Sequence, residues 1–253
     1  MYFDSHAHYD DEKFDGDRYE FLAALPENGV DFVVDPAQDA ATTARCIEMA
    51  ERVPFLYFAA GYHPHECGAM GDSEYDAIVR ALAHPKCVAV GEIGLDYHYD
   101  FHPHGVQQDV FRRMLALARE TGKPAIVHSR EATADTLAIL REFPDVRGVV
   151  HCYSGSWETA QELLAMGWHI SFTGSVTFKN AKKVLETAEK MPIERMMIET
   201  DAPYMAPEPH RGERNSSLLL PFIAERIGSL RGMTGDEVAA VTKQTALEFF
   251  KIG

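Results

Sequence analysis

Residues 87–128 read CVAVGEIGLDYHYDFHPHGVQQDVFRRMLALARETGKPAIVH, and this stretch contains two apolar runs joined by a helical pattern. The runs at 87–93 and 124–128 are apolar almost throughout, which is typical of parallel strands that are buried on both faces. Between them, Phe111 and Leu115 recur at helical spacing. The stretch therefore predicts a strand, a covering helix and a second strand parallel to the first.

The same alternation continues in both directions along the chain. Apolar runs that predict strands lie at 1–6, 30–35, 55–61, 87–93, 124–128, 146–151, 168–173 and 195–200. Helices are expected over 40–52, 73–83, 106–120, 131–142, 158–166, 182–190, 217–227 and 236–250. This order predicts an α/β fold, a (β/α)8 TIM-type barrel, formed by one domain over residues 1–253. A doubly wound open sheet is the alternative, but no glycine-rich phosphate turn follows the first run.

Composition narrows the class of protein. The chain has 253 residues, 46% of them hydrophobic and 25% charged, so it can bury a core and is neither disordered nor fibrous. No apolar run reaches the roughly 18 residues of a membrane span, and residues 1–6 lack the pattern of a secretion signal. The four cysteines form no C-x-x-C pair. We therefore expect a cytoplasmic protein that engages no membrane. The oligomeric state stays open, and a monomer is compatible with the sequence.

Polar residues concentrate at the carboxyl ends of the predicted strands. These ends carry four histidines and two carboxylates, namely His6, His8, Glu92, His128, His151 and Asp201. In a parallel barrel such ends meet at one rim, where barrel enzymes carry their active sites. His6 and His8 are two residues apart, so in an extended chain they project together as a two-nitrogen chelate. Burying all six groups without a cation would leave polar atoms without partners, so the pattern predicts a metal site.

Six segments together resemble the TatD-type metal-dependent hydrolases or nucleases, a family of amidohydrolase-like barrels. The segments are DSHAH at 4–8, GYHPH at 61–65, GEIGLDY at 91–97, HSR at 128–130, HCYSG at 151–155 and ETDAPY at 199–204. The resemblance covers nearly the whole chain, and it implies a TIM-type barrel that holds divalent metals and hydrolyses phosphodiester bonds. By this resemblance, one metal is bound by His6, His8 and Asp201, a second is bound by His128 and His151, and Glu92 bridges them.

The residue types agree with that ligand set. Imidazole and carboxylate without thiolate suit Zn²⁺, Mn²⁺, Co²⁺ or Ni²⁺, whereas Mg²⁺ prefers oxygen ligands. We expect two divalent ions, with zinc or manganese first and Mg²⁺, Co²⁺ or Ni²⁺ as alternatives. Two such ions about 3.5 to 4 Å apart activate a shared water molecule and hold phosphate oxygens. Asp201 is expected to act both as a ligand and as the general base. Glu199 is expected either to orient a ligand histidine or to be a buried structural acid.

Other residues are expected on the substrate side of the site. His63 resembles the family's substrate-side histidine, which bonds a phosphate oxygen or protonates the leaving group, whereas His65 is expected to hold the loop. Arg130 is expected to clamp a phosphate, with an ion pair to Glu131 or Asp135 as the alternative.

The long segment 201–216 carries two further candidates, Arg211 and Arg214, which are expected to contact substrate or to brace the loop. The chain departs from the family here. The family often continues Arg-Asn with an acidic residue and proline, whereas this chain reads RNSSL at 214–218. The departure puts the start of the next helix, and any substrate contact there, in doubt.

The function that follows is cleavage of phosphodiester bonds in DNA by a two-metal hydrolase, with 3'-5' exonuclease action as a further expectation. The net charge of 24 − 39 = −15 disfavours a broad electrostatic grip on nucleic acid, so phosphate binding must be local or mediated by metal. One alternative is an amidohydrolase-like enzyme acting on an amide, ester or phosphotriester. Several such relatives use a modified lysine as the bridging ligand, so a bridging Glu92 argues against this alternative. A non-catalytic binding protein is a third alternative, and the complete ligand set argues against it.

The aromatic segment 97–102 is interpreted as a base-stacking surface or as a loop over the barrel mouth.

Overall fold

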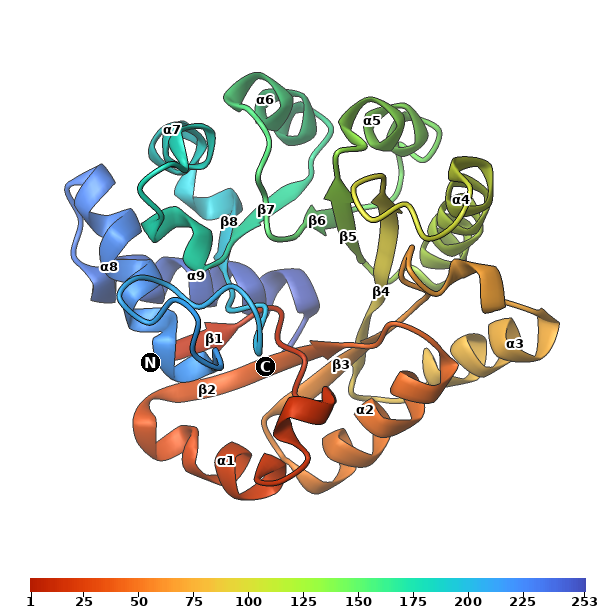
Figure 1. Cartoon of the computed structure of the whole chain (residues 1–253), viewed down its shortest axis with the longest axis horizontal. Coiled ribbons are helices and arrows are strands. Elements are labelled where there is room, and N and C mark those ends of the chain that lie inside the picture. Colours follow the sequence, from red (N-terminus) through yellow and green to blue (C-terminus); the bar gives the residue numbers. More distant parts are fainter.

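The computed structural model describes residues 1–253, and its eight strands are parallel and follow one another around the sheet in chain order (Figure 1). The strands are β1 Tyr2–Asp4, β2 Val30–Pro36, β3 Leu56–Ala60, β4 Cys87–Asp96, β5 Ala125–Arg130, β6 Gly148–Val150, β7 His169–Phe172 and β8 Met196–Ile198. Each predicted apolar run overlaps one of them, and β2, β4 and β5 continue past the predicted ends of their runs. The predicted barrel class is therefore confirmed.

The barrel is closed by the segments that follow its first and last strands. No regular strand pair joins β1 to β8, but the N–H of Asp201 donates to the carbonyl of His6 (2.9 Å). The N–H of His8 donates in turn to the carbonyl of Ala202 (2.7 Å). Three of the predicted ligands thus lie on the backbone segments that close the barrel, so these hydrogen bonds also position part of the site.

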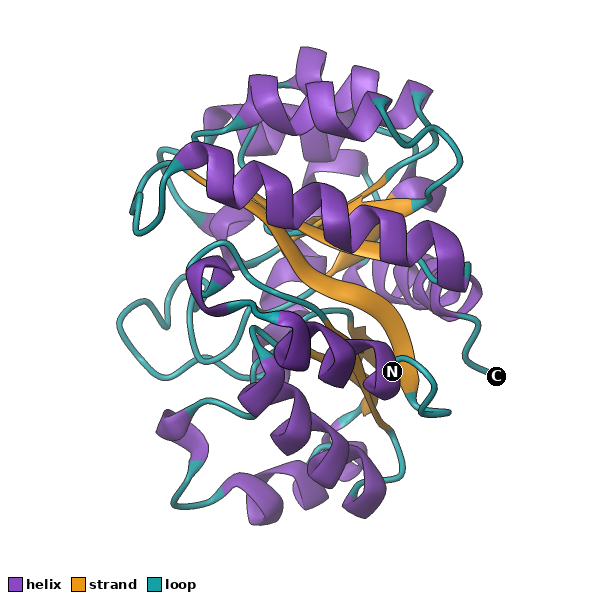
Figure 2. Ribbon diagram, turned by 90° about the vertical axis from the view of Figure 1, so that its right-hand side faces the viewer, coloured by secondary structure: helices purple, strands orange, loops and turns teal.

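Helices flank the strands on both sides (Figure 2). They are α1 Arg18–Ala24, α2 Ala40–Arg52, α3 Asp72–Ala81, α4 His104–Thr121, α5 Thr133–Arg141, α6 Trp157–Ala165, α7 Lys182–Lys190, α8 Leu220–Arg231 and α9 Gly235–Phe250. All eight predicted helices are present. Helix α1 was not predicted, because seven residues with Leu22 as the single buried side chain leave too short a periodic pattern. No helix combines the length and the apolar character needed to cross a membrane.

The interior of the barrel is closed at its amino-terminal end by α9. A cluster of twelve buried apolar residues combines inward-facing side chains of the strands, such as Phe3 and Ile126, with Phe249 and Phe250 of α9. The rings of Phe3 and Phe250 stack with centroids 5.9 Å apart. Helix α9 passes behind the strands in the view of Figure 1. Because this end is sealed, the polar residues can be approached only from the opposite rim.

Candidate metal centre

His6 and His8 follow β1 and are buried at the carboxyl end of the barrel. Their rings meet edge to face with centroids 4.8 Å apart, and their Nε2 atoms are 3.0 Å apart. Asp4 anchors this segment, because its carboxylate accepts hydrogen bonds from the hydroxyls of Thr200 and Ser217, each at 2.6 Å. The extended chain after β1 therefore presents two ring nitrogens to one point, as the spacing predicts.

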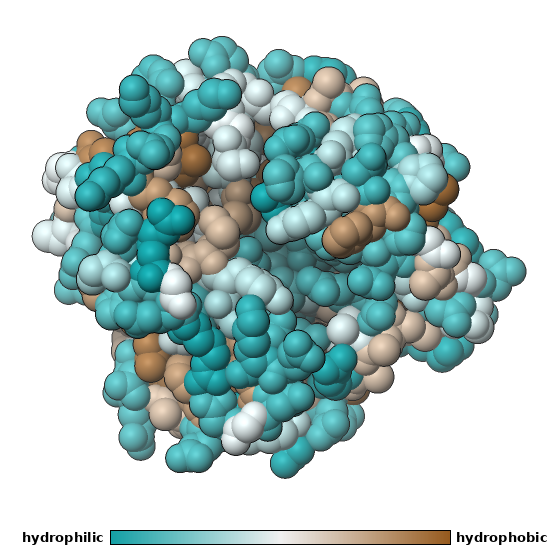
Figure 3. All heavy atoms as spheres, in the orientation of Figure 1, coloured by the Kyte–Doolittle hydropathy of each residue, from teal (hydrophilic) through white to brown (hydrophobic).

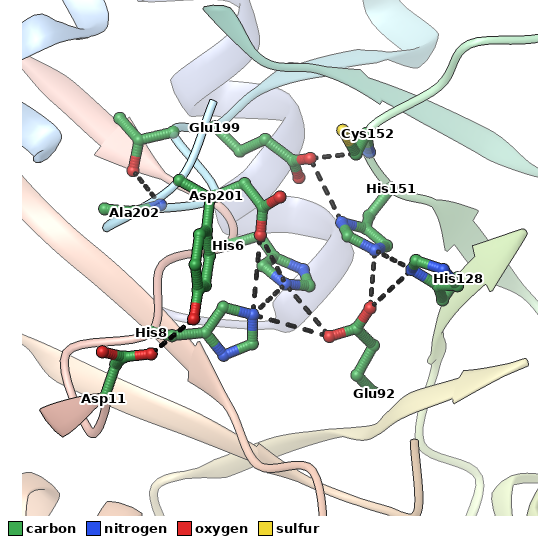
Figure 4. A network of polar contacts seen from close by, with 12 residues as sticks. His6, His8, Asp11, Glu92, His128, His151, Cys152, Glu199, Asp201 and Ala202 are labelled. Carbon is green, nitrogen blue, oxygen red and sulfur yellow. Dashed lines mark hydrogen bonds and ion pairs between the residues drawn. The ribbon is translucent and has the colours of Figure 1, made fainter. Parts of the chain in front are cut away.

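Glu92 lies in β4, and its carboxylate stands between two groups of imidazole rings (Figure 4). One oxygen, Oε2, faces the Nε2 atoms of His6 and His8 at 3.4 and 3.6 Å. The other oxygen, Oε1, faces Nε2 of His151 at 2.7 Å and Nδ1 of His128 at 3.1 Å. A single buried carboxylate is thus approached from two sides, which is the placement that a bridging ligand needs.

Asp201 joins the first of these groups from the segment after β8. Its Oδ1 lies 3.5 Å from Nε2 of His8 and 3.7 Å from Nε2 of His6. Its backbone has φ of 55°, a region that costs energy for a residue other than glycine and that occurs at functional sites. The side chain of Asp201 is 17% exposed while that of His6 is fully buried. Asp201 is therefore the acid of this group that faces the open rim.

Burial and neighbouring charges shift the pKa values of this cluster in different directions. Burial lowers the pKa of His63 to about 4. Burial also opposes protonation of His8, but Asp201 and Glu92 outweigh it and raise the pKa of His8 to about 10. Glu92 is buried as well, yet the neighbouring rings, His151 foremost, hold its pKa well below its usual range. The space between the two carboxylates therefore favours positive charge.

The donor atoms fit divalent cations. The Nε2 atoms of His6 and His8 both face the carboxylate oxygens of Glu92 and Asp201, at 3.4 to 3.7 Å. Two pairs of ring nitrogens lie at only 3.0 and 3.2 Å, between His6 and His8 and between His128 and His151. Converging nitrogen lone pairs beside carboxylate oxygens match the preferences of Zn²⁺, Mn²⁺, Co²⁺ and Ni²⁺. The chemistry of the residues therefore agrees with a metal centre at this place.

Glu199 lies behind His151, on the side away from Glu92. Its Oε1 is 3.3 Å from Nδ1 of His151, and its carboxylate accepts hydrogen bonds from the N–H of Cys152 (2.7 Å) and the hydroxyl of Ser171 (2.6 Å). Of the two alternatives for Glu199, this arrangement favours the one in which it orients a ligand histidine.

Two acids without a predicted role, Asp96 and Asp10, lie behind two other histidines. Asp96 Oδ2 is 3.2 Å from Nε2 of His128, and Asp10 Oδ1 is 3.9 Å from Nδ1 of His8. Both acids are buried. A signal for Asp96 was available, since it lies four residues after Glu92 in one strand and so shares its face.

His63 and His65 have different surroundings. Nε2 of His63 is 3.5 Å from Oε1 of Glu92, so this ring reaches the same centre as the predicted ligands. Nε2 of His65 instead lies 2.8 Å from Oδ2 of Asp96. Both rings line the cavity, but only His63 reaches Glu92, whereas His65 contacts Asp96.

The three predicted arginines do not lie together. Arg130 lines the cavity over the centre, with its guanidinium carbon 4.7 Å from the centre of the Tyr99 ring. No ion pair joins it to Glu131 or Asp135, whose carboxylates contact His98 and the Tyr97 hydroxyl instead.

Arg211 and Arg214 lie outside the cavity lining, which departs from their prediction as substrate-binding residues. The guanidinium of Arg214 forms a forked contact with Asp17 at 2.6 and 2.8 Å, and that of Arg211 covers the ring of Phe178 at 4.2 Å. These contacts occupy both side chains. They favour the alternative in which the arginines brace the loop.

The departure from the family at Ser216-Ser217 is accommodated by local hydrogen bonds. The N–H of Ser217 donates to the hydroxyl of Tyr9 (3.0 Å), and its own hydroxyl donates to Asp4 (2.6 Å). A 3₁₀ turn, η6 Ser217–Leu219, then leads directly into α8. The start of this helix is therefore well formed and is tied to the end of β1.

A cavity of about 550 Å³ opens over the centre. Its lining combines the metal-ligand candidates with rim residues, among them His8, His63, Glu92, Tyr99, Phe101, His128, Arg130, His151, Asp201 and Tyr204. In the space-filling view, this face is hollowed near its middle and mostly hydrophilic around the hollow (Figure 3). The cavity is large enough for a small substrate or for part of a larger one.

Comparison with known proteins agrees with this geometry. The family described as "TatD related DNase" matches residues 3–251. A relative from Bacillus subtilis, the uncharacterized metal-dependent hydrolase YabD, is 41% identical over all of both chains. A "3'-5' ssDNA/RNA exonuclease TatD" from Pantoea vagans is 31% identical, and the match covers 95% of each chain. The crystal structure of the TatD homologue YJJV from Escherichia coli superposes with a TM-score of 0.93 at 30% identity, covering 100% of this chain and 98% of that one.

Proposed function

This chain belongs to the TatD-related DNase family of metal-dependent hydrolases, and from that premise we propose that it cleaves phosphodiester bonds in DNA with the help of two divalent ions. The observation that carries the proposal is the carboxylate of Glu92, whose two oxygens face different groups of imidazole nitrogens. We extend the proposal to 3'-5' exonuclease action, which the name of the Pantoea relative supports.

The proposed ligands fall on the two sides of Glu92. One ion would be held by His6, His8 and Asp201, and the other by His128 and His151. When bound, such ions supply positive charge for phosphate oxygens and lower the pKa of a water molecule toward ~7. They would provide what a chain of net charge −15 lacks at its surface.

The side chains around the cavity supply the remaining functions. Asp201 is the partly exposed acid at the rim, so it is placed to accept the proton of the attacking water. His63 reaches the cavity from the segment after β3, and because its pKa is about 4 its neutral ring can donate an N–H hydrogen bond to a phosphate oxygen. Arg130 offers a fork of N–H donors to the phosphate from the cavity wall.

Metal analysis of the purified protein, coupled to a nucleic-acid panel, tests the proposal. We expect about two equivalents of zinc or manganese and metal-dependent cleavage of single-stranded DNA that EDTA abolishes. Glu92→Gln should reduce the metal content, because it weakens the ligand shared by both groups. Glu120→Gln, at an exposed position of α4, is the matched control and should leave metal content and cleavage unchanged.

Two results would contradict the proposal in different ways. A metal-loaded protein that cleaves neither single-stranded nor duplex DNA has another substrate. Hydrolysis of esters or phosphotriesters by that same preparation would identify the amidohydrolase-like alternative.

A further inference from the structure

Three aromatic side chains are exposed on this chain, and all three line the cavity over the metal centre. Tyr99 is 50% exposed, Phe101 62% and Tyr204 44%, and no other tyrosine, phenylalanine or tryptophan is exposed. Large apolar groups gathered at one rim are typical of a surface that binds a ligand. The exposed rings are therefore concentrated at the one rim where a ligand would enter the cavity.

Tyr99 and Phe101 stack on each other, and we call them the aromatic pair. Their rings stack with centroids 5.5 Å apart and planes at 22°. The ring of His65 supports both from below, edge-on, at 5.3 Å from Tyr99 and 4.8 Å from Phe101. The N–H of Tyr99 donates to the carboxylate of Asp96 (3.0 Å). The pair is thus held in place before any ligand arrives, which reduces the entropy lost on binding.

We propose that the aromatic pair is a stacking site for an unpaired nucleobase at the end of a nucleic-acid strand, an inference that rests on the proposed function. Aromatic side chains bind bases through their π-faces and accept any base. Such binding needs no positive surface, so it suits a chain of net charge −15. A base inside a duplex is stacked and paired, whereas a free end offers its face to the pair.

Arg130 links the aromatic pair to the metal centre. Its guanidinium lies over the Tyr99 ring at 4.7 Å, and it lines the same cavity as His63 and Glu92. A nucleotide whose base stacks on the pair would therefore bring its phosphate toward Arg130 and the centre. The cavity of about 550 Å³ lies within the range of small-molecule pockets, ~300 to 1,000 Å³, so it admits a terminal nucleotide.

The test measures binding separately from cleavage. Fluorescence anisotropy gives the Kd of the metal-loaded protein for single-stranded oligonucleotides whose linkages are phosphorothioates that resist hydrolysis. Each oligonucleotide carries either normal bases or abasic tetrahydrofuran units at its last two positions, on the 3' end in one set and on the 5' end in another. We expect the protein to bind normal ends about tenfold more tightly than abasic ends.

The double variant Tyr99→Ala/Phe101→Ala should lose that preference, with weaker binding of normal ends and unchanged binding of abasic ends. Phe101→Trp keeps the ring surface and should preserve the preference. Tyr75→Ala is the matched control, because Tyr75 of α3 also carries an arginine, Arg113 at 3.8 Å, but does not line the cavity. Should the double variant be unstable on thermal melting, Tyr99→Leu and Phe101→Leu are measured singly against the same expectation.

Cleavage of the corresponding phosphodiester oligonucleotides is followed in parallel, so that two failures are distinguished. Equal affinity for normal and abasic ends, or an unchanged preference in the double variant, overturns the stacking site even where DNA is cleaved. A base preference that depends on the aromatic pair, found without any cleavage, supports the stacking site and refutes the nuclease activity.

Discussion

Glu92 shows how strongly one buried side chain depends on its neighbours. Its carboxylate is 2% exposed, and such a group is costly to bury unless it is paired. Imidazole nitrogens on both sides provide the pairing at 2.7 to 3.6 Å. Two of these histidines follow β1, one lies in β5 and one follows β6. The residue therefore connects segments that are distant along the chain.

Replacing Asp201 by asparagine removes the proposed general base and keeps the shape of the side chain. We expect cleavage to fall by about 10²- to 10⁴-fold, the usual contribution of general acid–base catalysis. Steady-state assays with single-stranded DNA, together with metal analysis, measure the effect. Asp145→Asn, at an exposed position between α5 and β6, is the control and should retain full activity. Unimpaired turnover by Asp201→Asn would show that another group takes the proton.

His63→Ala should slow cleavage while the protein keeps both metal ions. The reason is that His63 Nε2 lies 3.5 Å from Glu92 Oε1, and the proposed ligand set is complete without this ring. Metal analysis before and after dialysis decides the point. Loss of one equivalent of metal from His63→Ala would make this histidine a ligand.

At the scale of elements, the helix boundaries agree with those predicted from local sequence wherever the periodic pattern is long. Helices α2 and α7 have the predicted bounds, and α9 begins with Thr234 and Glu237 in a reciprocal capping box. Strand β4 instead continues to Asp96, beyond the predicted end at residue 93. Its last residues pair with β5, from Gly94 opposite His128 to Asp96 opposite Arg130. The local sequence pattern does not predict this pairing.

Helix α9 closes the barrel through its phenylalanines, so Phe250→Ala should destabilise the fold. The ring of Phe250 is 4% exposed and contacts Phe3 and Phe249. Truncation of a buried phenylalanine costs about 3 to 5 kcal/mol. Urea unfolding of the variant measures the loss. Cleavage at low temperature, where the variant stays folded, should be normal, because α9 lies at the end opposite the site.

The start of β7 carries a half-buried titratable group, His169, against Phe249 of α9. Burial, together with the charges of Arg195 and Arg147, lowers the pKa of His169 to about 4. In the unfolded chain its pKa is about 6.5. The unfolded state therefore takes up the proton first as the pH falls, and the free energy of unfolding should decrease between about pH 6.5 and 4.

Urea midpoints at about pH 7.5 and pH 5 check this expectation for the unchanged protein and for His169→Phe. The variant should lose less stability over that interval, since its side chain takes up no proton. An identical loss in both proteins would mean that His169 does not contribute to the acid sensitivity.

For the whole molecule, the distribution of charge predicts how the proposed substrate is bound. With a net charge of −15, and with Arg211 and Arg214 engaged elsewhere, few cationic side chains remain near the cavity. We therefore expect a weak salt dependence of 1/KM for single-stranded DNA, with a log–log slope of magnitude about 1 to 2 between about 50 and 200 mM salt. Proteins that make 6 to 10 phosphate contacts show far steeper slopes. A slope above about 5 would indicate a broad basic surface instead.

The alternation of apolar runs and helical patterns followed from the chain alone, as did the strand ends that carry His6, Glu92 and His151. Such features depend on neighbours within a few residues, so they can be read from local sequence. The direction of each ring depends on distant contacts, and only the folded barrel showed that His65 turns to Asp96. The ion pair between Arg214 and Asp17 joins two residues that are 197 positions apart in the sequence. No local pattern contains that contact, because it exists only once the chain has closed on itself.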